Sequence, residues 1–381
     1  MKEGWEIKKL GEVIQLEYGK PLDHVYRKAD GLFPVYGANG ALSRSDKFYS
    51  DKPGIIVGRK GSAGEINLST EKFWPLDVTY FVTFKETLHS LKFLYYLLTF
   101  IDLPCLAKGV KPGINRHEVY AQSVQIPRLP DQQHIVTILD EAFEGIARAK
   151  ANAEKNLKNA RQLFESHLNS VFSQRGEGWE QNKLMALTTK IGSGATPRGG
   201  GESYKVEGTA LIRSLNIHDL GFRYSKLAFL DDAQADGLSN VILQPGDVLL
   251  NITGASVARC CTVPDDVLPA RVNQHVSIIR PIANRLDSEF LHYLLISKYY
   301  KDQLLQTGAE GGATRQAITK AQIQDFTVRY PADISEQKSI VDSLDSILEQ
   351  TQRLVSIYQK KIESLDALKK SILQKAFTGG L

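Results

Sequence analysis

The sequence predicts an α/β (α+β) protein built as an internal repeat. Two similar mixed α/β modules are joined by two long antiparallel helices that form a coiled coil, so a pseudo-two-fold axis relates the halves. Three observations support this prediction. Two long stretches carry the apolar spacing of an amphipathic helix, they match each other at one constant offset, and each follows a segment of short strands punctuated by glycine.

The first long helix is expected from Ile135 to Phe172 and the second from about Ser335 to Phe377. No proline interrupts either stretch, and apolar residues recur every three or four positions in both. At about 1.5 Å per residue, each helix would be roughly 60 Å long. A lone helix of this length would leave its narrow apolar stripe in water, so the natural partner of each helix is the other copy.

Matching motifs open and close the two helices. The pattern Gln-x-x-Ile-Val-x-x-Leu-Asp starts at Gln132 and again at Gln337, and Leu-x-x-Ser-x-Leu-x-x-x-Phe starts at Leu163 and again at Leu368. We expect the apolar stripes to pack against each other. The outer faces of the helices, together with Gln132 and Gln337, are then the expected surface for partner proteins.

The segments before the helices repeat in the same order. Gly-Trp-Glu-x-x-Lys-Leu begins at Gly4 and at Gly178, and Phe-Leu-x-Tyr-Leu-Leu, a short predicted helix, begins at Phe93 and at Phe290. Buried strands that end in polar loops lie between these motifs. The predicted segments are a first module, a first long helix, a second module and a second long helix, with bounds 1–131, 132–174, 175–334 and 335–381.

Composition limits the class of protein. The formal net charge is +4, which permits a polyanionic partner without requiring one. Three cysteines, of which Cys260 and Cys261 are adjacent, provide no disulfide framework, so we expect a reducing, cytoplasmic location. The chain opens with polar residues, and its longest apolar run, Phe93–Leu103, is too short to cross a membrane. We therefore expect no membrane association.

Motifs that would indicate catalysis are missing. The sequence has no phosphate-binding Gly-x-x-x-x-Gly-Lys-[Ser/Thr], no His-Glu-x-x-His and no cysteine–histidine cluster for a metal. It also lacks the Asn/Asp-Pro-Pro-aromatic stretch of amine methyltransferases and the acidic spacing of nucleases. We therefore expect a binding protein with no catalytic residues, no metal ligands and no cofactor of its own.

The repeated plan resembles the specificity (S, HsdS) subunit of type I restriction–modification systems over essentially the whole chain. The resemblance is carried by both Gly-Trp-Glu-x-x-Lys-Leu motifs, by both Gln-x-x-Ile-Val-x-x-Leu-Asp helix starts and by the loop Gly194-Ala-Thr196-Pro197. The first module departs from the pattern at that loop, where it has Gly19-Lys20-Pro21. The role of this loop in the first module is therefore left open.

The resemblance implies a DNA-binding subunit with two target recognition domains. Each domain would recognise one half of an asymmetric bipartite site in double-stranded DNA. The long helices would set the spacing of the two halves and dock two methylation subunits, which restriction subunits of the same system can join. The methyl donor S-adenosylmethionine would then belong to the methylation subunits, and this chain would be non-catalytic.

Candidate DNA contacts lie in the polar loops that follow the apolar strands. Arginine suits bidentate contact with guanine, asparagine suits adenine, and lysine mainly holds phosphate. In the first module the candidates are Arg59, Lys60, Ser62, Lys108, Lys111, Asn115 and Arg116. In the second they are Arg198, Arg213, Asn216, Asn251, Thr253, Ser256, Thr314, Arg315 and Lys320. For each residue taken singly, the competing interpretation is ordinary solvated loop surface.

Two other classes of protein compete with the specificity subunit. A coiled-coil scaffold without sequence-specific DNA binding would explain the long helices, but it does not require divergent, arginine-bearing loops on repeated modules. An autonomous nuclease or methyltransferase would need the catalytic motifs that the chain lacks. The sequence therefore favours a DNA-specificity subunit over both.

Overall fold

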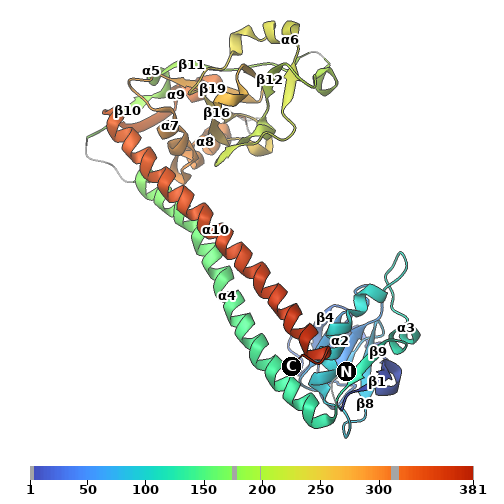
Figure 1. Cartoon of the computed structure of the whole chain (residues 1–381). Coiled ribbons are helices and arrows are strands. Elements are labelled where there is room, and N and C mark those ends of the chain that lie inside the picture. The colour runs from blue at the N-terminus through green and yellow to red at the C-terminus, as the bar shows by residue number, and fades with distance from the viewer. Residues whose placement is uncertain (1–3, 174–177, 198, 310–316, 381) are drawn as a thin grey trace. The chain divides into compact units, whose positions relative to one another are not determined.

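The computed structural model describes residues 4–173, 178–197, 199–309 and 317–380. The chain forms two compact units (Figure 1). The first unit comprises Met1–Glu154 and Gln359–Leu381, and the second comprises Lys155–Tyr358. Both long helices are thus divided between the units, whereas the sequence set the helices apart as segments of their own. The physical reason is that each half of a helix packs into the core of the module beside it.

The first module is built on a four-stranded antiparallel sheet in the order β2-β8-β5-β6. A smaller sheet, β4-β3-β7, and the pair β1–β9 complete its strands. Leu94, Leu97 and Leu98 of α2 lie in one buried cluster with Ile55 and Val57 of β5. The bounds are β1 Glu6–Lys9, α1 Leu10–Val13, β2 Ile14–Tyr18, β3 Phe33–Gly37, β4 Gly40–Ser45, β5 Gly54–Gly58, β6 Ile66–Ser69, β7 Trp74–Pro75, β8 Thr79–Phe84, α2 Leu91–Ile101, α3 Arg116–Tyr120 and β9 Ser123–Ile126.

The second module repeats this topology strand for strand. Its sheets have the orders β11-β19-β16-β17 and β15-β12-β18, and β10 pairs with β20. The bounds are β10 Trp179–Lys183, α5 Leu184–Leu187, β11 Thr188–Ser193, β12 Thr209–Ile212, β15 Ala228–Leu230, β16 Val248–Asn251, β17 Cys260–Thr262, β18 Ala270–Val272, β19 Val276–Pro281, α7 Ser288–Ile296, α9 Lys320–Asp325 and β20 Thr327–Pro331. It also contains a short hairpin, β13 Ile217–His218 and β14 Gly221–Phe222, and the helices α6 Asp232–Asp236 and α8 Lys298–Ala309. The predicted internal repeat is confirmed.

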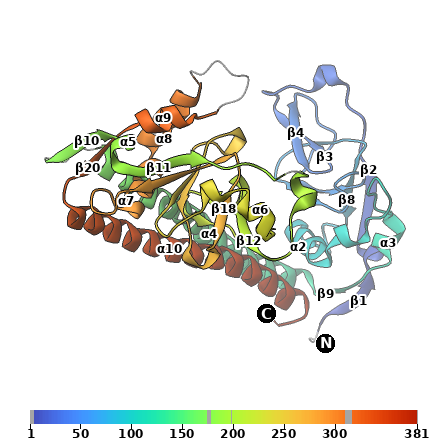
Figure 2. The same ribbon diagram turned by 90° about the horizontal axis from the view of Figure 1, so that it is seen from above.

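The long helices are α4, Leu129–Ser173, and α10, Ile334–Phe377. Helix α4 begins earlier than its apolar pattern because Pro130 fits the first turn, where a backbone N–H has no helical partner. In the first unit the start of α4 shares a buried cluster with the end of α10 through Leu139 and Phe377. In the second unit Phe164 near the end of α4 shares a cluster with Leu344 near the start of α10. The helix halves therefore run antiparallel in each unit (Figures 1 and 2).

A buried glutamine fixes the start of each long helix to its module. The Gln132 side chain is 0% exposed. Its Oε1 accepts a hydrogen bond from the backbone N–H of Ser90 at 2.9 Å, at the start of α2. Its Nε2 donates to the carbonyls of Pro127 at 2.9 Å and Leu88 at 3.1 Å. One amide thereby satisfies three backbone groups that surround the first turn of α4.

Gln337 makes the same three hydrogen bonds in the second unit, and we call each of these two sets of contacts a joint. It is also 0% exposed, its Oε1 accepts from the N–H of Asp287 at 2.8 Å, and its Nε2 donates to the carbonyls of Pro331 at 2.8 Å and Arg285 at 3.0 Å. The expectation that Gln132 and Gln337 belong to a partner surface is therefore wrong. Both amides are used entirely inside the module to which they belong.

The aspartate that ends the repeated helix motif makes a second contact of the joint. Asp140 accepts hydrogen bonds from the Tyr96 hydroxyl and from the Lys92 ammonium, both at 2.6 Å. In the second unit the Tyr293 hydroxyl donates to Asp345 in the same way. The two repeated motifs thus face each other, because the tyrosine of the short helix binds the aspartate of the long helix.

The pKa of Asp140 reflects these contacts. Burial alone raises the pKa of this carboxyl, but the hydrogen bonds from Lys92 and Tyr96 and the Lys92 charge together outweigh burial, so the pKa of Asp140 is lowered from its ordinary value. Burial and the bond to Asp140 raise the pKa of Tyr96. The pair is therefore a carboxylate with a neutral phenol at neutral pH.

We predict that Gln132→Ala lowers the free energy of unfolding of the first unit by about 2–4 kcal/mol, because the change leaves buried backbone groups at Ser90, Leu88 and Pro127 without partners. Urea denaturation followed by hydrogen exchange of α2 and α4 would measure the loss. The matched control is Gln133→Ala, since Gln133 is the exposed neighbour on the same turn. Equal effects of the two changes would contradict the proposed role of the joint.

Asp140→Asn should reduce the loss of stability of the first unit in acid. Because the folded pKa of Asp140 lies below its ordinary value of about 3.9, the stabilisation is present above about pH 4 and disappears as the pH falls through the folded pKa. Thermal unfolding of the wild type and the variant from pH 7 to pH 2.5 would test this. The gap between the two curves should close at low pH, and parallel curves would show that the carboxylate contributes nothing.

Candidate nucleic-acid interface

In the first module, two predicted loops meet beyond the end of β5. The N–H of Ile114 donates to the carbonyl of Arg59 at 3.1 Å, and the N–H of Gly61 donates to the carbonyl of Pro112 at 2.9 Å. Lys60 also bridges to Gly113. These backbone bonds bring the predicted residues of both loops onto one surface, which we call the first-module cluster: Arg59, Lys60, Ser62, Lys108, Lys111, Asn115 and Arg116.

Tyr18 joins this cluster although the sequence analysis did not single it out. It ends β2, is 45% exposed, and lies opposite Tyr80 of β8 with 5.1 Å between the ring centroids. The Cζ atoms of Arg59 and Arg116 lie 5.3 and 5.4 Å from the centroid of the Tyr18 ring. Two guanidinium groups from separate loops therefore share one exposed aromatic ring. The available signal was position, because Tyr18 directly precedes the glycine loop at the end of its strand.

The charged residues of the first-module cluster differ in how far they are already paired. Arg59 donates from Nε and Nη2 to the carbonyl of Asp77 at 3.2 and 2.6 Å, so its position is fixed. Lys108 forms an ion pair with Glu118 at 2.6 Å. Lys60 and Lys111 are exposed and make no ion pair within the described part of the chain. Asn115 caps α3 by accepting from the N–H of His117 at 2.9 Å and stays exposed.

In the second module the equivalent loops meet in the same way. The N–H of Ile318 donates to the carbonyl of Ile252 at 2.8 Å, and Thr253 bridges to Ala317. The Thr253 hydroxyl lies 2.6 Å from Nδ1 of His275, and both residues line a shallow pocket of about 400 Å³ that also includes Ser256. This pocket lies at the loop after β16, which corresponds to the loop after β5 in the first-module cluster.

Two predicted contacts of the second module are buried and act as loop supports. Asn216 accepts from the N–H of Arg213 at 3.1 Å and donates to the carbonyl of Arg223 at 2.9 Å. Asn251 donates to the carbonyl of Ser214 at 2.9 Å and to the Ser256 hydroxyl at 3.1 Å. Both side chains are 0% exposed. The expectation of direct DNA contact is therefore corrected, because these amides hold the loops that carry the exposed groups.

The remaining predicted residues of the second module fall into two groups. Arg213 is half-buried, lies 5.0 Å above the Tyr204 ring and donates to the carbonyl of Lys226, so it is held within the module. Lys320 is exposed at the start of α9. Arg198, Thr314 and Arg315 lie outside the described residues.

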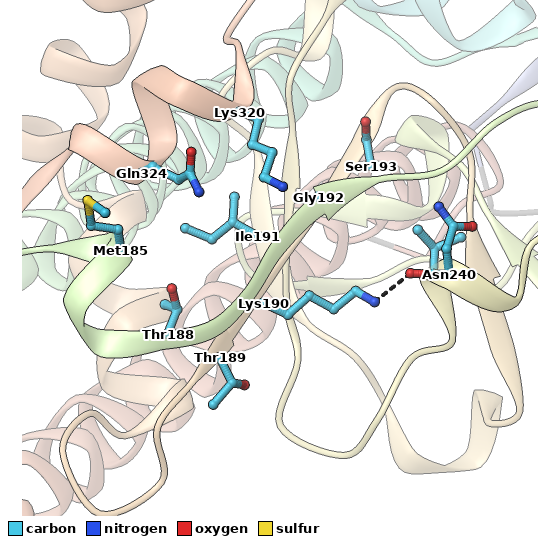
Figure 3. Close-up of a pocket in the computed structure, with 11 residues that line it drawn as sticks. Met185, Thr188, Thr189, Lys190, Ile191, Gly192, Ser193, Asn240, Lys320 and Gln324 are labelled. Atoms are coloured by element: carbon cyan, nitrogen blue, oxygen red, sulfur yellow. Dashed lines mark hydrogen bonds between the residues drawn. The ribbon is translucent and has the colours of Figure 1, made fainter.

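A groove of about 580 Å³ runs along β11, the edge strand of the larger sheet of the second module (Figure 3). Lys320 and Gln324 of α9 line one side, and Asn240 lines the other. Lys190 extends from the strand to donate to the carbonyl of Asn240. The other lining residues are mostly small or hydroxyl-bearing: Met185, Thr188, Thr189, Ile191, Gly192, Ser193 and Val241. Two ammonium groups and several hydroxyls suit an extended, anionic chain.

Pairing registers show that the two modules place different chemistry at equivalent positions. Tyr18 pairs with Tyr80 in the first sheet, whereas Ser193 pairs with Ser277 in the second. Of the two loops that meet in each module, the second leads into a short helix. This helix is α3 in the first module, which begins with Arg116, and α9 in the second, which begins with Lys320. The frame is shared, but the aromatic and arginine-rich surface of the first module has no counterpart at these positions in the second.

Close backbone approach at one glycine in each module maintains that frame. A Cβ on Gly19 would lie 2.1 Å from the carbonyl oxygen of Leu76, and a Cβ on Gly194 would lie 1.8 Å from that of Val272. No side chain fits at either distance. The loop Gly19-Lys20-Pro21, whose role the sequence left open, therefore begins with the same close approach as the loop of the second module.

Further features of the described residues bear on the kind of site. They contain no group of three or more histidine, cysteine, aspartate and glutamate side chains placed to hold a metal ion. Within the same part of the chain, every helix is too short or too polar to cross a membrane.

Comparisons with known proteins agree with this architecture. The family model of the type I restriction modification DNA specificity domain matches residues 2–158 and 232–364. The specificity subunit of the type I restriction enzyme MjaVIII of Methanocaldococcus jannaschii is 24% identical, and the match covers 99% of this chain and 93% of that protein. A solved chain of a type I restriction–modification system, described for its complex assembly and conformational transition, matches with a TM-score of 0.75 at 20% identity, covering 100% of this chain and 99% of that one. The HsdS subunit from Thermoanaerobacter tengcongensis matches with a TM-score of 0.62 at 20% identity, covering 100% and 98%.

Proposed function

This chain belongs to the family of the type I restriction modification DNA specificity domain, and we propose that each of its two modules recognises one half of a bipartite duplex DNA site. The observation that carries the proposal is the repeated frame with different exposed side chains. Tyr18 and Arg116 in the first module correspond to Ser193 and Lys320 in the second. Two frames of one design with unlike surfaces suit two unlike half-sites, so the complete target is asymmetric.

The exposed and half-buried groups of these surfaces divide into those suited to bases and those suited to phosphates. Sequence is recognised by side chains that reach base edges, mainly in the major groove, while contacts to phosphates set position. In the first-module cluster Arg116 and Asn115 have the donor geometry for base edges, and Lys60 and Lys111 suit phosphates. In the second module Thr253 and Ser256 line the shallow pocket, and Lys190 and Lys320 line the groove along β11.

The long helices are the proposed spacer and partner surface. Their apolar stripes are used inside the two units, which leaves the polar outer faces of α4 and α10 for other proteins. Because the chain contains the same joint twice, at Gln132 and at Gln337, we propose two equivalent docking sites for methylation subunits. Methyl transfer would take place on those subunits with their own S-adenosylmethionine, in the cytoplasm, and this chain would supply only the choice of sequence.

Selection from randomised duplex DNA tests the proposal, with the full chain purified together with its methylation subunits. The expected result is an enriched motif in two parts, separated by a gap of fixed length and different on the two sides. Recovery of DNA without any motif would overturn the proposal and favour a scaffold. Methyl transfer by this chain alone, in the absence of the methylation subunits, would show that its proposed non-catalytic role is wrong.

We predict that Lys320→Ala weakens binding to all duplexes by a similar factor. If Lys320 neutralises one phosphate, the slope of log K against log salt should become shallower by about 1. Titration of the selected duplex and of an unrelated duplex at several salt concentrations measures both effects. Lys298→Ala is the matched control, because Lys298 is exposed in the same unit but already paired with Asp302 at 2.7 Å. A loss confined to the selected duplex would instead make Lys320 a base contact.

A further inference from the structure

We infer that Arg116 recognises a guanine in the half-site of the first module, and that Tyr18 is the residue that positions it. This inference rests on the proposed function.

The guanidinium of Arg116 is placed but not used. Its Cζ lies 5.4 Å from the centroid of the Tyr18 ring, and within the described residues no hydrogen bond or ion pair involves its side-chain nitrogens. Arginine carries five N–H donors in a planar fork and stays charged at all relevant pH values. Arg116 can therefore donate to a ligand without breaking a hydrogen bond or an ion pair to the described residues.

The other arginine at the same ring shows the contrast. Arg59 lies 5.3 Å from the Tyr18 centroid, but its Nε and Nη2 already donate to the carbonyl of Asp77. Its charge raises the local positive potential, while the Nε side of its fork is occupied by a backbone carbonyl. The structure thus separates two arginines that the sequence could not distinguish, and Arg116 is the one whose whole fork is free of hydrogen bonds to the described residues.

The Tyr18 ring, which contacts Arg116, also packs against a second tyrosine. Tyr18 lies against Tyr80, a buried residue in the first-unit core, with the rings tilted at 56°. Burial and the interaction with the Tyr18 hydroxyl raise the pKa of Tyr80 to about 12, so this support stays uncharged. Because the sheet fixes the Tyr18 ring, the contact with this ring reduces the conformational freedom of the Arg116 side chain before DNA binds.

The base follows from the pattern of donors. Guanine presents two acceptors, O6 and N7, side by side in the major groove, and the guanidinium fork matches that pair. Adenine presents N7 beside the N6 amino donor, which would face a second donor of Arg116, and pyrimidines offer no such pair of acceptors. Lys60 and Lys111, both exposed on the loops of the same cluster, can hold the flanking phosphates.

The test compares selections from randomised duplex DNA by four forms of the full chain, each purified with the methylation subunits: wild type, Arg116→Ala, Tyr18→Phe and Tyr18→Ala. The wild-type motif should contain a strongly preferred G·C pair in one half. With Arg116→Ala the preference at that pair should vanish, and affinity for the selected duplex should fall about 10- to 100-fold, the range expected for one bidentate contact. The other half of the motif should stay unchanged, which also shows that the variant is folded.

Tyrosine variants and a modified base test the geometry of the contact. Tyr18→Phe should keep the G·C preference because the ring face remains, whereas Tyr18→Ala should weaken it at the same base pair. Replacing that guanine by 7-deazaguanine removes N7, so it should weaken binding by the wild type and leave Arg116→Ala unaffected. Lys85→Ala is the charge control. Lys85 is exposed and directly follows the end of β8, whereas Tyr80 lies near the start of that strand.

The outcomes separate this inference from the proposed function. If the wild type selects a bipartite motif and Arg116→Ala selects the same motif with the same strength, the role of Arg116 is refuted while the proposed function stands. An equal loss on all duplexes would also refute it, because that pattern marks a phosphate contact. Failure of the wild type to select any motif would overturn both proposals.

Discussion

A buried side-chain amide at the start of each long helix is the contact on which the rest of the structure depends. Gln132 and Gln337 each satisfy three backbone groups where a strand, a short helix and a long helix meet. Backbone groups at such a junction cannot use regular helix or sheet pairing, and burying them without partners would be costly. The amide therefore fixes the direction in which the long helix leaves its module, and the tyrosine–aspartate contact about two turns further along fixes its rotation.

A frame fixed in this way lets the exposed loops change. The loops after β5 and β16 are tied by backbone hydrogen bonds to the loops before α3 and α9, so their shape depends little on which side chains they carry. Gly19 and Gly194 keep the adjacent loop close to the sheet in both modules. The strand order is therefore the same although the side chains differ. The first module has Tyr18, Tyr80, Arg59 and Arg116 at the positions where the second has, in the same order, Ser193, Ser277, Ile252 and Lys320.

The sequence alone predicted what repeats and what is periodic. The antiparallel helix pair, the repeated modules and the two basic loops of the first module all follow from matched motifs and apolar spacing. It failed where side-chain direction decides the outcome. Gln132 looked like a polar residue on a helix surface, but the chain before it folds over it. Asn216 and Asn251 were expected in exposed polar loops, but both turn inward, and Asn251 is the last residue of β16. Tyr18 was missed because its partners, Arg59 and Arg116, come from loops distant in sequence, and no local pattern predicts that they meet.

The division of the long helices between the two units has a consequence for how the chain is made. The second unit is one continuous stretch, Lys155–Tyr358, so all of its residues have been synthesised before the last part of α10 is made. The first unit begins earlier in the sequence but cannot complete its core until the end of α10 has been made, because Leu373, Ala376 and Phe377 belong to the same core as Trp5. The module translated first is thus the module finished last, and a chain that stops shortly after Tyr358 would contain every residue of one unit and lack the closing helix of the other.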